Sequence, residues 1–190
     1  MGVSSLLLRA TLGLALPTLT AAAHELEDNR ATLVLRDRTH LSATIFLAYP
    51  EALHQALAPQ REFMAFLLIY SAMKPDSLQK ELLKAQSQFE LSTHLYVGPG
   101  KEVVTFIHWT WPDLKQVQAI LQQRVMQAMV DPRTHSHEAP VEIHADANAL
   151  REITSVRVQF PGEFQKVLVV AYRPSQLWLE GKTLSTEIRF

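Results

Sequence analysis

The sequence predicts a single α+β domain with a largely antiparallel sheet and about three helices, preceded by a cleavable signal peptide. Two regions, residues 31–48 and 141–190, alternate apolar and polar side chains as strands do. Residues 50–90 and 112–130, on either side of a predicted hairpin, carry the proline, capping and apolar-face signals of helices. Strands at both ends of a chain with helices between them are typical of the α+β class.

The amino-terminal residues 1–23 have the layout of a secretory signal peptide. Arg9 is their only charge, residues 10–19 form an uncharged and mostly apolar run, and Ala21 and Ala23 occupy the small-residue positions before a cleavage site. The apolar run is shorter than the roughly 20 residues that a membrane span needs. We therefore expect cleavage after Ala23 and a periplasmic or secreted mature protein that starts at His24.

Residues 24–190 then form one exported domain, and its composition narrows the function classes. The chain carries a net charge of −1, with neither a basic patch for nucleic acid nor a further apolar run long enough to span a membrane. It has no cysteine, which excludes disulfides, thiol nucleophiles and thiolate metal sites. A protein partner remains compatible with this composition.

Strand signals recur along the chain. A hairpin around Gly98-Pro99-Gly100 places Tyr96 opposite Val103 and turns His94 and His108 to opposite faces. The expected strands are 31–38, 40–48, 91–97, 102–111, 156–160, 167–172, and a closing pair, Gln176–Leu179 and Leu184–Phe190.

Helices are expected over residues 50–73, in two pieces divided near Pro59, and after the Pro-Asp pairs at 75–76 and 112–113. In the two later helices, Asp76 with Gln79 and Asp113 with Gln116 have the spacing of a capping box. Residues 63–70 (FMAFLLIY) are apolar on all sides, which predicts a central helix. We therefore expect four of its side chains to be buried against the sheet: Phe63, Phe66, Leu67 and Ile69.

The strongest candidate metal ligand is His24. After cleavage its free α-amine and its imidazole form a bidentate nitrogen chelate that suits Cu(II). This position resembles the amino-terminal half of the histidine brace of lytic polysaccharide monooxygenases and of some periplasmic copper carriers. The resemblance covers one residue, and it implies a second imidazole from elsewhere in the chain. His40 is the first candidate for that partner, and His94 and His108 are the others on expected strands.

A second candidate metal site is the segment His135-Ser136-His137-Glu138. In an extended chain the two imidazoles point to one face, and with the carboxylate they suit zinc, nickel or copper. The alternative is a solvated polar loop between a helix and a strand.

Signatures of hydrolases, P-loop proteins and dinucleotide-binding folds are absent from the sequence. Three hypotheses about function remain. The first is an exported protein that binds a transition metal, copper or zinc, through histidines. The second is an exported accessory or assembly protein that acts through protein contacts, without catalysis or metal. An oxidative copper enzyme built on His24 is the third.

Overall fold

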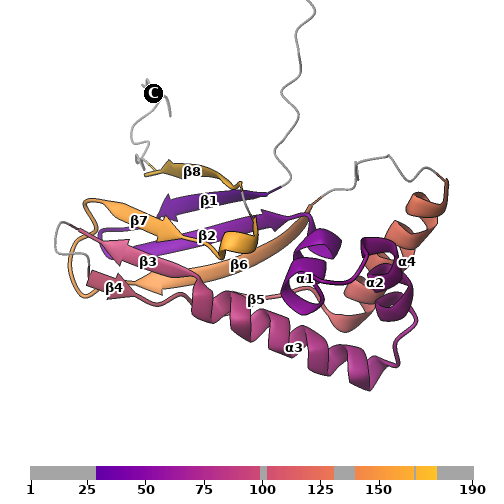
Figure 1. Cartoon of the computed structure of the whole chain (residues 1–190). Helices are drawn as coiled ribbons and strands as arrows, with labels where there is room; N and C mark the ends of the chain where they lie inside the picture. The colour runs from indigo at the N-terminus through magenta and orange to yellow at the C-terminus, as the bar shows by residue number, and fades with distance from the viewer. Residues whose placement is uncertain (1–28, 99–101, 131–139, 165, 175–190) are drawn as a thin grey trace, which may run out of the picture.

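The computed structural model describes residues 29–98, 102–130, 140–164 and 166–174. In this part the chain forms an α+β fold of four α-helices and eight strands, arranged in two mostly antiparallel sheets (Figure 1). The expected fold class is thereby confirmed. The predicted signal peptide 1–23, His24, the segment 135–138 and the strand pair expected over residues 176–190 lie outside the described residues.

The larger sheet has five strands in the order β5-β6-β2-β1-β8, and all its neighbours are antiparallel except β1 and β8. Asp37 turns the chain between the first two strands, because its Oδ1 accepts the backbone N–H groups of Thr39 (2.7 Å) and His40 (2.8 Å). The strands are β1 Arg30–Leu35, β2 His40–Leu47, β5 Ile107–Thr110, β6 Val141–Asn148 and β8 Leu168–Tyr172.

The smaller sheet has the order β4-β3-β7, made of Glu102–Val104, His94–Val97 and Val156–Gln159. Tyr96 lies opposite Val103, as predicted.

The expected long strand over residues 102–111 is wrong. It ends at Val104, and β5 crosses to the larger sheet, where a register shift separates its two pairs with β6. His108 adopts a left-handed backbone conformation with φ of 54° at this irregularity. His94 therefore lies opposite Gln159 on β7, and it shares no strand pair with His108.

The helices are α1 Tyr49–Leu57, α2 Phe63–Ser71, α3 Pro75–Ser92 and α4 Leu114–Val130, with a short 3-10 helix at Gly162–Phe164. The division near Pro59 is confirmed. The capping box of α4 is also present, since Gln116 N–H donates to Asp113 Oδ1 (2.8 Å) and Asp113 N–H donates to Gln116 Oε1 (2.9 Å). At α3 the expected Asp76 cap is wrong: Lys74 is the N-cap residue and forms no side-chain cap hydrogen bond.

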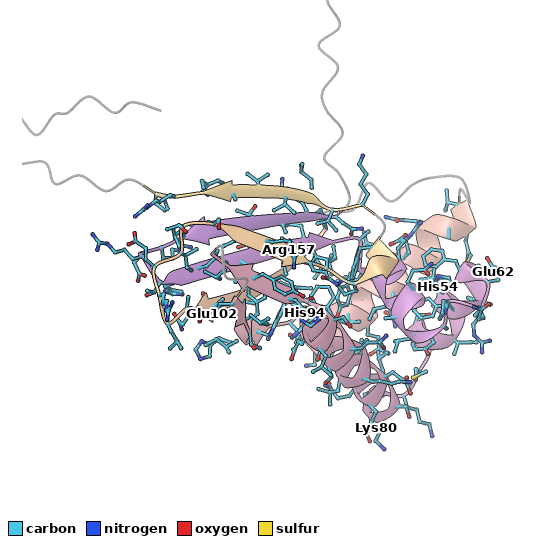
Figure 2. All side chains as sticks on the ribbon, turned by 60° about the vertical axis from the view of Figure 1, so that its left-hand side comes forward. His54, Glu62, Lys80, His94, Glu102 and Arg157 are labelled. Atoms are coloured by element: carbon cyan, nitrogen blue, oxygen red, sulfur yellow. The ribbon has the colours of Figure 1, made fainter. Side chains whose placement is uncertain are left out.

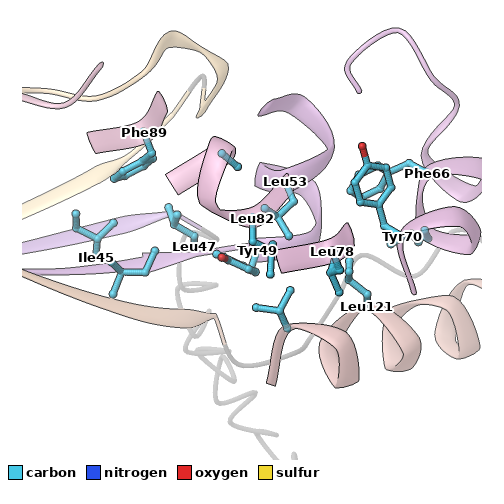
Figure 3. Close-up of a cluster of buried hydrophobic side chains, with 14 of the residues drawn as sticks. Ile45, Leu47, Tyr49, Leu53, Phe66, Tyr70, Leu78, Leu82, Phe89 and Leu121 are labelled. Carbon is cyan, nitrogen blue, oxygen red and sulfur yellow. The ribbon is translucent and has the colours of Figure 1, made fainter. Parts of the chain in front are cut away.

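One face of the larger sheet carries the hydrophobic core. At one end of this face the smaller sheet packs on Leu33, Leu41 and Ala145. At the other end Ile45 and Ile143 join the buried side chains of the helices, which Figure 3 shows around Leu82 and Leu121. The alternate residues of β1 and β2 point to the opposite face and are only half-buried, so this second face is the polar side of the sheet.

Candidate functional site

His40 and Asp146 form an imidazole–carboxylate pair on the polar face, near the end of the sheet where β2 begins. His40 begins β2, and Asp146 lies on the neighbouring strand β6, two positions away from the residue directly opposite His40. The His40 Nε2 atom lies 3.2 Å from Asp146 Oδ1, and Ser42 Oγ donates to the same oxygen at 3.0 Å. The three residues occupy alternate positions of two paired antiparallel strands, so their side chains project from the same face of the sheet.

These contacts hold Asp146 in its ionised form. Its partial burial alone would raise the pKa, but the hydrogen bonds from His40 and Ser42 outweigh it and leave the pKa below the ordinary value of 3.8. The electrostatic interactions of Asp146 with His40 and His108 lower its pKa further. The carboxylate is therefore a permanent negative charge at neutral pH.

A second imidazole–carboxylate pair lies further along the same face. The His144 Nε2 atom is 3.2 Å from Glu142 Oε1, and its Nδ1 atom is 3.4 Å from Thr44 Oγ1 on β2. Both residues line a cavity of about 580 Å³ between the start of β6 and the first half of α4, whose other walls include Trp111 and Ile120. This arrangement orients one imidazole at the rim of a cavity.

Sequence reasoning did not single out Glu142, His144 and Asp146 as a group. Their signal was present, since residues 141–148 (VEIHADAN) alternate strictly and place these polar side chains on one face. Chemically, the face offers two imidazole–carboxylate pairs. His40 and His144 cannot hold one ion together, because four positions of the strand register separate them, roughly 13 Å.

Of the four predicted metal ligands, His40 alone falls within the described residues, and its imidazole contacts Asp146. His24, His135 and His137 lie outside them. Within the described ranges there is no group of three or more histidine, aspartate or glutamate side chains placed to hold a metal ion. Two other histidines lie elsewhere in the fold: Figure 2 shows His54 among the helices and His94 on β3. The His54 Nε2 atom is 2.7 Å from the Arg61 carbonyl oxygen, which is a structural role.

A different candidate surface lies on α2. Phe66 and Leu67 are fully buried, as predicted, and Phe63 is half-buried, but Ile69 is 43% exposed and Leu68 is 45% exposed. The expectation that the helix packs on the sheet is wrong, because α2 packs on α1 and α4 at the end of the molecule (Figure 1). An all-apolar helix in that position cannot bury every side.

The exposed side of α2 forms a regular stripe. It consists of Ala65, Leu68, Ile69 and Ala72, which we call the α2 stripe. Ala65 is half-buried and the other three are exposed. The spacing i, i+3, i+4 and i+7 places the four residues on one side of the helix.

The neighbouring helix α4 fixes the direction in which the stripe faces. The Ser71 carbonyl accepts the amide groups of Gln118 and Gln122 at 3.5 Å each, and the Arg124 guanidinium lies over the Phe63 ring, 5.5 Å from its centroid. The two helices are therefore antiparallel, and α4 covers the side of α2 away from the stripe. Further exposed apolar side chains, Met126, Met129 and Val130, follow at the end of α4.

Comparison with known proteins finds no matching family model, no significantly similar curated protein and no solved structure with a significant match. None of the helices within the described ranges is long and apolar enough to cross a membrane.

Proposed function

We propose that this chain is an exported accessory protein that acts by contact with another protein, and that the α2 stripe is its contact surface. The observation that supports this is the exposure of Leu68 and Ile69 on a helix that is apolar all round. Exposed single apolar residues are ordinary, but a stripe at helical spacing is a surface that a second helix or a groove can cover.

The composition of the stripe fits close packing. Its two alanines let a partner backbone approach, while Leu68 and Ile69 supply branched side chains that fill a complementary groove. Complete burial of a leucine or isoleucine side chain stabilises by about 1.5–3 kcal/mol, so two such residues supply a useful share of a binding free energy. The exposed methionines of α4 are flexible side chains of the kind that adapt to a partner surface.

The test uses a photo-crosslinking amino acid at Leu68 in the exported protein. The matched control carries the same amino acid at Leu83, which is 52% exposed on the different helix α3. We expect a discrete cross-linked species from position 68, its absence from position 83, and its loss when Ile69→Lys is added. Equal cross-linking at both positions, or none at position 68, would contradict the proposal.

A second candidate function, metal binding at the amino terminus, is favoured by one geometric observation. β1 begins at Arg30, which lies opposite Phe46, and Phe46 in turn lies opposite Glu142. The chain therefore enters the sheet at the end that carries Glu142 and His144. Five residues lie between His24 and Arg30, and the six residue steps span at most about 20–22 Å.

This reach favours His144 over His40 as the second imidazole. His40 lies six positions along β2 from Phe46, roughly 20 Å from the entry point, whereas His144 lies opposite Thr44, only two positions from Phe46. We propose that a Cu(II) or zinc site, if His24 forms one, is completed by His144, with Glu142 as the neighbouring carboxylate.

Titration with Cu(II) tests this second proposal on protein that starts at His24. Two changes should abolish tight binding: one extra amino-terminal residue, which removes the primary amine from the histidine, and His144→Gln. His40→Gln is the matched control and should bind as the unmodified protein does. Equal binding by all four proteins, or by none, would refute the amino-terminal site.

A further inference from the structure

The edge strand β8 exposes more apolar surface than an edge strand normally does. Its five residues, Leu168–Tyr172 (LVVAY), are all apolar or aromatic and all exposed. It pairs with β1 on one side, and among the described strands nothing pairs with its other side. A free edge of this kind is a template for pairing with another strand, and proteins normally blunt or cover it.

The inner side of β8 also borders a cavity of about 400 Å³. Leu33 and Leu41 of the larger sheet line it, together with Ile153, which precedes β7, and Val156, the first residue of β7. Ala171, Tyr172 and Arg173 also line it, and so do the polar residues Glu152, Thr154 and Ser155. The space between the two sheets is therefore open beside β8, and apolar side chains of both sheets are part of its lining.

The next segment of the chain starts at this opening. β8 ends at Tyr172, Arg173 lines the cavity, and Pro174 and residues 175–190 follow. Their sequence predicts two short strands, Gln176–Leu179 and Leu184–Phe190, around Glu180-Gly181-Lys182.

We propose that residues 176–179 of the same chain add to the free edge of β8 as an antiparallel strand, and that residues 184–190 pair with them in turn. A connection of three residues, 173–175, is an ordinary hairpin length. The tether raises the local concentration of this segment to about the millimolar range, so it outcompetes a second copy of the chain at ordinary protein concentrations. This inference is independent of the α2 stripe.

The positions of the leucines set the register. A three-residue connection places Gln176 opposite Tyr172, Leu177 opposite Ala171, and Leu179 opposite Val169. Val169 and Ala171 lie opposite Ala31 and Leu33 of β1 and share their inward direction. Leu177 and Leu179 then point to the apolar inner side, and Trp178 points outward beside Val170. A connection one residue shorter or longer would turn the two leucines outward and Trp178 inward, because successive side chains of a strand point to opposite faces.

The absence of cysteine allows a direct test of this register in the full chain. In the variant Val169→Cys with Leu179→Cys, the two Cβ atoms should lie about 4.5–5.5 Å apart, which is close to disulfide geometry. In the matched control, Val169→Cys with Trp178→Cys, the second side chain points to the opposite face. Under mild oxidation of dilute protein we expect an intramolecular disulfide in the first variant and little in the control.

Every other result overturns the proposal. Equal cross-linking in both variants means that the segment has no fixed register. Cross-linking only between molecules means that the occupant is a second copy. A disulfide in neither variant means that the segment lies elsewhere.

Hydrogen exchange supplies a second readout that needs no disulfide. Leu177→Lys with Leu179→Lys should speed amide exchange across β8 and increase binding of a hydrophobic dye. The control, Gln176→Lys, changes a side chain on the outer face and should leave both unchanged. Unaltered exchange in the double variant would contradict the pairing.

Discussion

His40 Nε2 lies 3.2 Å from Asp146 Oδ1, so that an imidazole at the start of β2 is joined to a carboxylate on β6. Ser42 contacts the same oxygen, and together the contacts lower the pKa of Asp146 despite its partial burial. A carboxyl group whose pKa is lowered by folding stabilises the folded state above its unfolded pKa, and this contribution is lost as the pH falls through the folded value.

The first prediction follows from the lowered pKa of Asp146 in the folded protein. Asp146→Asn keeps the size of the side chain and removes its charge, so it should reduce the free energy of unfolding at about pH 7, by less than about 1 kcal/mol for so exposed a pair. At about pH 2 both carboxyl and amide are neutral, and the difference should vanish. Urea unfolding of Asp146→Asn and of the unmodified protein at the two pH values measures the difference in the free energy of unfolding. A difference that is equal at both, or larger in acid, would show that the charge of Asp146 does not matter.

The second prediction concerns the two sides of α2. Leu67 is fully buried, so Leu67→Ala should lower the free energy of unfolding by about 2–5 kcal/mol. Its neighbour Leu68 lies in the α2 stripe, and Leu68→Ala should change stability by no more than about 0.5 kcal/mol. Thermal or urea unfolding of both variants compares the two faces. Similar losses would mean that the stripe is covered within the isolated chain.

The third prediction compares the two Pro-Asp helix starts. Asp113 accepts the Gln116 N–H at 2.8 Å, so Asp113→Ala should lower the free energy of unfolding by about 1 kcal/mol. Asp76 lies in the first turn of α3, after an N-cap that makes no side-chain hydrogen bond. Asp76→Ala should therefore cost less, about 0.3–1 kcal/mol from the helix dipole alone. A larger loss at position 76 would reverse the assignment of the caps.

Most of the fold could be predicted from local patterns. The β1–β2 hairpin, the break near Pro59 and the Tyr96–Val103 pair follow from alternation and turn residues, which act over a few positions. The crossing of β5 into the larger sheet could not be predicted. It depends on a backbone irregularity at His108 and on the packing of Trp109 against both cores, which no local pattern specifies.

The candidate site was predicted less well, for a related reason. His40 could be singled out as a strand histidine, but its contact with Asp146 joins residues 106 positions apart and depends on which strands become neighbours. The exposure of Ile69 was also missed. Apolarity on every side of α2 predicts burial only if the helix is central, and α2 instead packs on α1 and α4 at the end of the molecule.

The affinity for the partner cross-linked at position 68 tests directly whether the α2 stripe is the contact surface. Leu68→Lys with Ile69→Lys places two charges in the α2 stripe, while Leu83→Lys places one on the equally exposed surface of α3. Each variant is first shown to unfold as cooperatively as the unmodified protein. We expect the stripe variant to lose at least about tenfold in affinity, roughly 1.4 kcal/mol, and the α3 variant to bind unchanged. Undiminished binding by a folded stripe variant would contradict the claim that this protein acts through α2.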